Sequence, residues 1–341
     1  MAGKCTDAET IAKIRTIYAE TQSVSETARR VGVYWNTVKK YVSQLSKDCD
    51  TSARPVARDN MTPRIQYDPR DVAFPVGFPE PAPEAGGATM PEPVELHYDT
   101  FDIDTPGNWL ILNDVHIPYH DKRTIELAVA DARKRATVGV LLNGDIMDCA
   151  GVSDHYRDPN VTRLEDEIDK TVAFLKWIRS QFPTARIVYK EGNHEWRLPR
   201  FIANYAPELF GLKQLRLPNL LELDSMGVEW VADKRVIQLG KLSVVHGHEF
   251  RGGGGVNPAR WLWLRAGTSA LCGHFHRSSG HDEQTLDRKI HSVWSVGCAC
   301  FLYPQYDPNN KWTHGWASVE VSGNRHYLVT NRKVLRDGSI A

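Results

Sequence analysis

Five short apolar runs in this chain each lead into residues that suit neither a strand nor a core. Between them lie amphipathic stretches such as "DKRTIELAVADARKRA" and "LEDEIDKTVAFLKWIRSQF", and this alternation predicts an α/β fold. The runs and the residues that follow them are "WLIL" and NDVH (113–116), "VGVLL" and NGD (143–145), "RIVY" and GNHE (192–195), "LSVV" and HGH (246–248), and "SALC" and GHFH (273–276).

Ligands of open α/β sheets bind outside the carboxyl ends of the strands, so we expect these five loops to meet at one edge. Together they supply two aspartates, one asparagine and at least four histidines. Such a mixture of oxygen and imidazole donors suits manganese, iron or zinc and is too rich in nitrogen for a calcium or magnesium cage. The donors are too many for one ion. We therefore expect two divalent ions sharing a carboxylate, with manganese favoured.

Each motif alone is a weak signal, because a loop histidine is often a hydrogen-bonded surface residue and an aspartate after a strand often caps a helix. Their order is much more specific. The series D-x-H, GD-x-x-D, GNHE, HGH and GH-x-H, over residues 109 to about 300, resembles the calcineurin-like metallophosphoesterase superfamily. The resemblance implies a four-layer α/β/β/α sandwich over residues 98–341 that hydrolyses phosphoester bonds.

Two late segments extend this expected fold. "IHSVWSVGCACF" is expected to be a strand, and "WASVEVSG" with "RHYLVTN" should form a hairpin, because alternating apolar runs flank the turn residues Ser322, Gly323 and Asn324.

The resemblance also assigns roles to individual residues. No protein nucleophile is required, because the ions activate water. The two ligand sets, with Asp145 as the bridge, would be Asp114, His116, Asp145 and His276 for one ion, and Asp145, Asn193, His246 and His274 for the other.

His194 is similar to the acid of the family, which protonates the leaving oxygen while Asp148 or another carboxylate orients it. Its alternative role is structural, within the loop. His248 is expected near the ligands or facing the substrate.

Arg197 matches an arginine that grips phosphate in the protein phosphatase branch, although a surface salt bridge is an equal alternative. That branch needs a further arginine where this chain has Cys149, so a protein phosphatase is disfavoured.

The stretch "FRGGGGVNPARWLWLRAG" offers a helix start that could meet a phosphate. A connecting loop is the somewhat better interpretation, and the tryptophans are more typical of a core.

The first 47 residues predict a separate helical domain. Residues 6–20 have a capping-box start at Thr6 and a helical apolar stripe, and a second capping box at Ser23 opens a helix that ends at Gly32. A third helix, "VYWNTVKKYVSQL", follows, and residues 20–45 resemble a helix-turn-helix of the transposase or sigma-factor type.

This segment has eight lysines and arginines against four acidic residues, whereas the whole chain is neutral. We therefore expect it to bind DNA. A protein-interaction module is the alternative. The residues expected to face DNA are Tyr34, Trp35, Asn36, Lys39 and Lys40.

Residues 48–97 contain nine of the nineteen prolines and few apolar residues, so they are expected to be an extended linker. The chain lacks a long apolar run, and its first residues do not resemble a signal peptide, so we expect a cytoplasmic protein without a membrane span. The six cysteines show no CxxC spacing and are expected to be buried, inert thiols.

Two functions remain open. The first is a DNA-directed phosphodiesterase or nuclease that its helix-turn-helix tethers to DNA. The second is a phosphomonoesterase or small-nucleotide phosphodiesterase whose N-terminal helices serve assembly or localisation. A DNA-binding regulator with an inactive phosphatase fold is disfavoured, because every expected ligand is present.

Overall fold

The computed structural model describes residues 7–21, 23–34, 37–39, 41–42, 93, 98–154, 163–232, 234–304, 307–335 and 337–341. The chain divides into two compact units, residues 1–92 and residues 93–341. Almost all of the expected linker lies outside the described residues, as do the expected DNA contacts Trp35, Asn36 and Lys40.

The N-terminal unit contains helices α1 (Ala8–Thr21) and α2 (Val24–Val31), and residues 37–39 and 41–42 are also helical. Ser23 caps α2 as expected by accepting a hydrogen bond from the amide of Glu26, and Gly32 ends the helix at φ 74°. The expected cap Thr6 lies outside the described residues. Among the described residues, Asp7 accepts a hydrogen bond from the amide of Thr10 at 2.8 Å at the start of α1.

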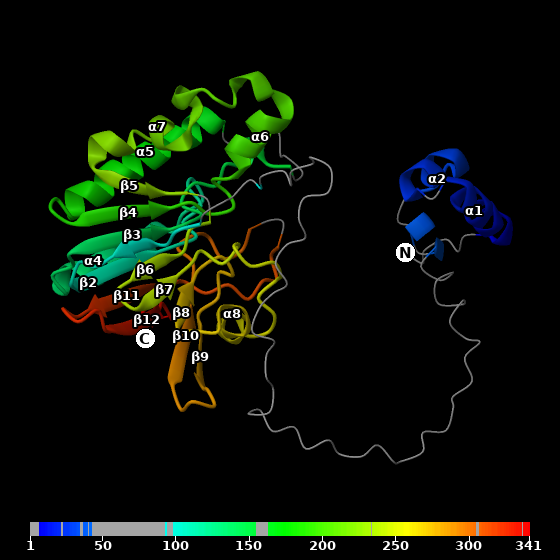
Figure 1. Ribbon diagram of the computed structural model, residues 1–341. Helices are drawn as coiled ribbons and strands as arrows, with labels where there is room; N and C mark the ends of the chain where they lie inside the picture. Colours follow the sequence, from blue (N-terminus) through cyan, green and yellow to red (C-terminus); the bar gives the residue numbers. More distant parts are fainter. Residues whose placement is uncertain are drawn as a thin grey trace, which may run out of the picture. The chain divides into compact units, whose positions relative to one another are not determined.

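The second unit contains two six-stranded sheets (Figure 1). We call β12-β11-β2-β3-β4-β5 the first sheet and β1-β6-β7-β8-β10-β9 the second. The strands are β1 (Phe101–Ile103), β2 (Gly107–Leu112), β3 (Gly139–Asn143), β4 (Arg186–Lys190), β5 (Val228–Val231), β6 (Ile237–Leu239), β7 (Leu242–Val244), β8 (Ala270–Cys272), β9 (Ser279–Gln284), β10 (Ile290–Ser295), β11 (Gly315–Val321) and β12 (Tyr327–Lys333).

The pairing within the first sheet confirms the expected hairpin. Strands β2, β3, β4 and β5 are parallel, which requires a crossover connection between each successive pair. Strand β11 pairs antiparallel with both β2 and β12, so that Val319 lies opposite Trp109 on one side and Val329 on the other. The expected strand in "IHSVWSVGCACF" is β10.

Alternation along β2 shows how the layers are held together. Leu110 and Leu112 face a core shared with α4 (Lys122–Lys134) and α5 (Leu164–Gln181), whereas Trp109 and Ile111 pack between the two sheets. On the second sheet, Leu262 of α8 (Pro258–Ala266) packs in a third cluster with β8 and β10. Helices, two sheets and a further helix form the expected four-layer α/β/β/α sandwich (Figure 1).

The remaining elements are short. They are α6 (Arg197–Tyr205) and α7 (Leu217–Leu220), with 3₁₀ turns at Ala150–Val152, Pro207–Leu209, Lys213–Leu215 and Leu223–Met226. Within the described part of the chain, no helix combines the length and apolar character needed to cross a membrane.

Candidate metal centre

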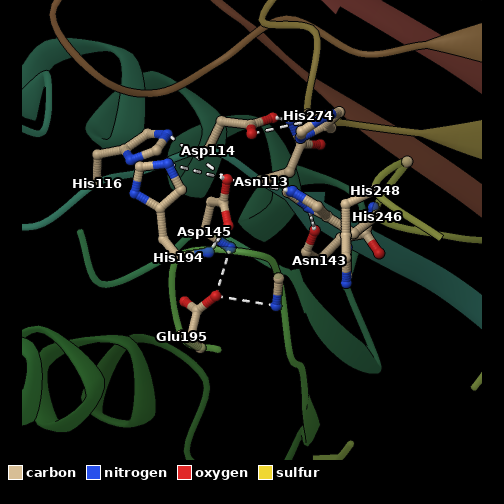
Figure 2. Close-up of polar contacts among 12 residues, drawn as sticks. Asn113, Asp114, His116, Asn143, Asp145, His194, Glu195, His246, His248 and His274 are labelled. Atoms are coloured by element: carbon tan, nitrogen blue, oxygen red, sulfur yellow. Dashed lines mark hydrogen bonds and ion pairs between the residues drawn. The ribbon is translucent and has the colours of Figure 1, made fainter. Parts of the chain in front are cut away.

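The five expected strand ends do converge, but they belong to two sheets and not to one. The loops after β2, β3 and β4 leave the first sheet, and those after β7 and β8 leave the second. These are the two sheets of the expected four-layer sandwich. Two sheets packed face to face bring their strand ends to a common edge, where Asp114, Asp145 and His246 lie close together (Figure 2).

The backbone at this edge is strained. Non-glycine residues with positive φ are uncommon and cost free energy unless the surroundings enforce them. Five of the expected ligands have this conformation, which supports a function for the loops beyond connecting strands. They are Asp114 (φ 53°), His116 (51°), Asp145 (53°), His274 (66°) and His276 (55°).

Asp145 lies at the centre of the group, with imidazoles on both sides (Figure 2). Its Oδ2 is 3.2 Å from Nε2 of His246, 4.0 Å from Nε2 of His116 and 3.8 Å from Nε2 of His194. Its Oδ1 accepts a hydrogen bond from the backbone amide of His194 at 2.9 Å. This position suits the bridging carboxylate expected from the sequence.

Hydrogen bonds indicate which nitrogen of His246 carries a proton. Its Nδ1 lies 2.8 Å from the carbonyl oxygen of Asn143, which can only accept, so Nδ1 is the donor. In the neutral ring, Nε2 therefore presents a lone pair towards Asp145. A backbone carbonyl that fixes the ring in this way is typical of metal-ligating histidines.

His116 and His276 show the same convergence. Nδ1 of His116 is 2.8 Å from Oδ1 of Asp148, while its Nε2 is 3.1 Å from Nε2 of His276. Nε2 of His276 is also 3.2 Å from Oδ1 of Asp114. Two imidazole nitrogens and a carboxylate in such proximity repel each other unless a proton or a cation lies among them.

The pKa values reflect the same crowding. Burial alone would lower the pKa of His246 and His276, but the charges of Asp145 and Asp114 raise them to about 10 and about 9. Positive charge is thus strongly favoured at both places.

Asn193 adds a separate sign of an absent partner. Its Oδ1 is buried and makes no hydrogen bond within the described residues. A buried amide oxygen without a partner costs free energy. A cation bound by this oxygen would explain why it makes no hydrogen bond.

The residues present therefore fit two ions. Two groups of possible ligand atoms share Asp145, one with His116 and His194 and the other with His246 and His274, and in each group the atoms lie within 4.8 Å of one another. A third group contains His116, His276 and Cys300. These groups contain five of the seven expected ligands, together with His194, which was expected as the acid. Asp114 joins them through Nε2 of His276 at 3.2 Å, and Asn193 precedes His194, whose amide donates to Asp145.

His194 and Asp148 lie beside this centre. Nδ1 of His194 is 3.0 Å from both the carbonyl oxygen and Oδ1 of Asp148. Burial alone would lower the pKa of His194, but Asp145 and Asp148 raise it above its ordinary value. Asp148 also orients His116, so one carboxylate holds two imidazoles.

The side chain of Arg197 is 14% exposed, and its guanidinium lies 3.7 Å from Oδ2 of Asp148, so the ion pair of the alternative interpretation is present in a largely buried place. Its guanidinium donates to the carbonyl oxygen of Asp148 at 2.8 Å and lies 3.0 Å from Nε2 of His194. His248 lies next to His246, with ring centroids 5.3 Å apart, and burial lowers its pKa to about 4.

Glu195 is a buried residue whose role the sequence analysis missed. It accepts backbone hydrogen bonds from Asp145, Ile146, Met147 and Gly192, and a further bond from the hydroxyl of Tyr189. It therefore ties the loop after β3 to the loop after β4 (Figure 2). Its place beside Asn193 and His194 was the only signal in the sequence.

A second missed feature is a buried ion pair between the sheets. Nζ of Lys190, at the end of β4, is 2.9 Å from Oε1 of Glu249, which follows β7. Glu249 also accepts the amides of His246 at 2.9 Å and Gly247 at 2.6 Å. The signal available was a lysine at the end of an otherwise apolar strand.

The glycine-rich segment leads into α8. The side chain of Asn257 caps this helix by accepting from the amide of Arg260. Trp261 packs edge-on against Phe275 with centroids 5.0 Å apart, in agreement with a core role. In the N-terminal unit, the side chain of Tyr34 is 85% exposed, and Lys39 is also exposed.

Comparison with known proteins found no matching family model and no matching curated protein. Several solved structures are similar to part of the chain. A Vps29 mutant from Entamoeba histolytica is 13% identical and covers 69% of this chain and 96% of its own, with a TM-score of 0.36. The phosphoesterase Yfce from E. coli is 12% identical, with 66% and 98% covered and a TM-score of 0.29, and a dimetal phosphatase from Danio rerio is 10% identical, with 67% and 99% covered and a TM-score of 0.31.

Proposed function

We propose that this protein is a dinuclear-metal phosphoesterase and that its substrate is DNA, cleaved as a phosphodiester. The observation that carries the hydrolase part is the central carboxylate of Asp145, which belongs to two groups of possible ligand atoms at once. Two ions about one carboxylate would supply a nucleophile from water at neutral pH and neutralise charge on a phosphoryl group.

The chain's own residues would position the substrate and move the proton. Asp145 and Asp148 raise the pKa of His194 above its ordinary value, which favours the protonated imidazole that a leaving oxygen requires. Nε2 of His194 is at present within 3.0 Å of Arg197. The proposal therefore requires the guanidinium to turn away from His194 when the substrate binds. The phosphate oxygens of the substrate are suitable acceptors for the guanidinium.

The DNA part of the proposal depends on the N-terminal unit. Its basic excess attracts phosphates, and Tyr34 is exposed next to the expected DNA-facing residues. The alternative, a phosphomonoesterase or small-nucleotide phosphodiesterase, uses the same metal centre and differs only in what reaches it.

Three substrates compared side by side would test both parts. The protein is loaded with manganese, iron or zinc in turn and assayed on a chromogenic diester, a chromogenic monoester and end-labelled DNA. We expect faster turnover of the diester and of DNA than of the monoester. Asp145→Asn, and the wild-type protein after chelation, should turn over none of the three substrates. If the metal-loaded wild-type protein hydrolysed none of the three substrates, the hydrolase proposal would be contradicted.

The tether requires its own comparison. A variant that begins at Pro93 should keep its rate on the chromogenic diester and lose affinity for DNA in a salt-dependent anisotropy titration. Equal DNA affinity with and without residues 1–92 would contradict the tether. Preference for the monoester would favour the alternative function.

A further inference from the structure

Cys300 lies at the metal centre, although the sequence indicated only inert thiols. Its side chain is 3% exposed, and its Sγ belongs to a group with a ring nitrogen of His116 and one of His276, all within 4.8 Å of one another. Two donors on one ion, each bonded at about 2.0–2.3 Å, are at most about 4.6 Å apart. The three atoms are therefore close to ligating separation.

The backbone holds Cys300 in this place. On one side the amide of Ala299 donates to the carbonyl oxygen of Asp114 at 3.1 Å, and on the other the amide of Phe301 donates to Tyr119 at 2.9 Å. The carbonyl oxygen of Cys300 faces Nε2 of His314 at 2.8 Å. The segment after β10 is thus fastened to the D-x-H loop, and the thiol is presented to the imidazoles by several independent contacts.

We propose that Cys300 is a thiolate ligand of the ion held by His116 and His276, a fifth donor beside Asp114 and Asp145. This assignment rests on the metal centre of the proposed function and deepens it. Its chemical consequence is a preference for softer cations, because thiolate favours zinc, iron or cobalt over manganese.

Cobalt substitution tests the assignment without an activity assay. The full-length protein is loaded with Co²⁺, cobalt content is measured by elemental analysis, and the absorption spectrum is recorded. We expect a thiolate-to-cobalt charge-transfer band in the wild-type protein, lost in Cys300→Ser and kept in Cys272→Ser, whose thiol is also buried but packs under α8. Cys300→Ser should also weaken zinc binding more than manganese binding, by about 10- to 100-fold in the ratio of the two affinities.

The possible outcomes distinguish failure of the Cys300 assignment from failure of the proposed metal centre. If cobalt binds with visible d–d bands but no charge-transfer band, Cys300 is not a ligand and the metal centre stands. If the band disappears in Cys298→Ser and persists in Cys300→Ser, the assignment is wrong. If no cobalt binds at all, the metal centre itself fails. Should Cys300→Ser not fold, the spectra of Cys149→Ser, Cys272→Ser and Cys298→Ser decide. A band kept in all three leaves Cys300 as the remaining buried thiol among the described residues, and a band lost in one of them overturns the assignment.

Discussion

His194 and Asn193 are neighbours in one loop, but the proposal gives them separable roles. Asn193→Ala removes the buried unpartnered oxygen, so we expect loss of metal and of all activity. His194→Ala should keep its metal and lose about 100- to 10,000-fold in rate, the usual contribution of one general acid. Metal content by elemental analysis distinguishes the two variants.

Leaving-group dependence provides the control for this prediction. A leaving group that is already a weak base, such as a nitrophenolate, needs less protonation, so His194→Ala should slow that ester less than a poorer one. Equal slowing of both diesters, or loss of metal, would assign His194 a structural role in the loop.

Glu167 predicts a pH dependence of stability. It accepts the amides of Ala150 and Gly151, yet burial and the charge of Asp148 raise its pKa to about 7 from an ordinary 4.5. The folded state thus keeps a proton that the unfolded state releases. This contribution to stability is full below about pH 4.5 and is lost as the pH rises towards 7.

Glu167→Gln cannot ionise, so its urea midpoint should fall less than that of the wild-type protein between pH 4.5 and 7. Glu165→Gln, on the same turn of α5 but exposed, is the matched control and should follow the wild-type curve. Parallel curves for all three proteins would show that Glu167 does not cause the dependence.

At the scale of elements, Glu195 joins the ends of β3 and β4 through five hydrogen bonds. Glu195→Gln replaces one accepting oxygen by a donor, which leaves buried amides without partners at about 1–3 kcal/mol each. We expect the free energy of unfolding to fall by more than about 2 kcal/mol. Urea unfolding measures this.

Glu229→Gln is the comparison for that loss. Glu229 pairs with Arg186 at 2.7 Å on the exposed edge of the same sheet, and exposed ion pairs contribute less than about 1 kcal/mol. A similar loss in both variants would mean that Glu195 does not hold the loops together.

At the scale of the whole second unit, the pair Lys190 and Glu249 joins the two sheets beside the metal centre. Lys190 is fully buried, and although burial would raise the pKa of Glu249, the charge of Lys190 lowers it to about 2. Glu249→Gln removes the counter-charge and leaves a buried ammonium with neutral acceptors alone, among them the carbonyl oxygen of Arg235. We expect a loss of about 3–5 kcal/mol.

A double-mutant cycle tests this pairing. Lys190→Met combined with Glu249→Gln removes both charges, so the double variant should lose less than the sum of the single losses, by about 0.5–3 kcal/mol. Strict additivity in urea unfolding would contradict direct coupling between the two sheets through this pair.

The elements and the ends of the strands could be predicted from the sequence, because alternation and helical periodicity are local properties. "WLIL", "VGVLL" and "RIVY" are β2, β3 and β4, and the loops that follow them carry the expected aspartates and histidines. The hairpin of β11 and β12 followed from its turn residues in the same way. The N-terminal helix-turn-helix and its DNA contacts stay predictions.

Only the tertiary structure decided which groups meet. Asp114 and His276 are 162 positions apart and lie on different sheets, and no local pattern states that their side chains are 3.2 Å from each other. The same reason hid Glu195, the pair of Lys190 with Glu249, and Cys300, because a carboxylate, an ammonium or a thiol acquires its role from partners that distant segments supply. The sequence by itself determined the donors and the loops that carry them, whereas the packing of two sheets decided their neighbours, their burial and their charge.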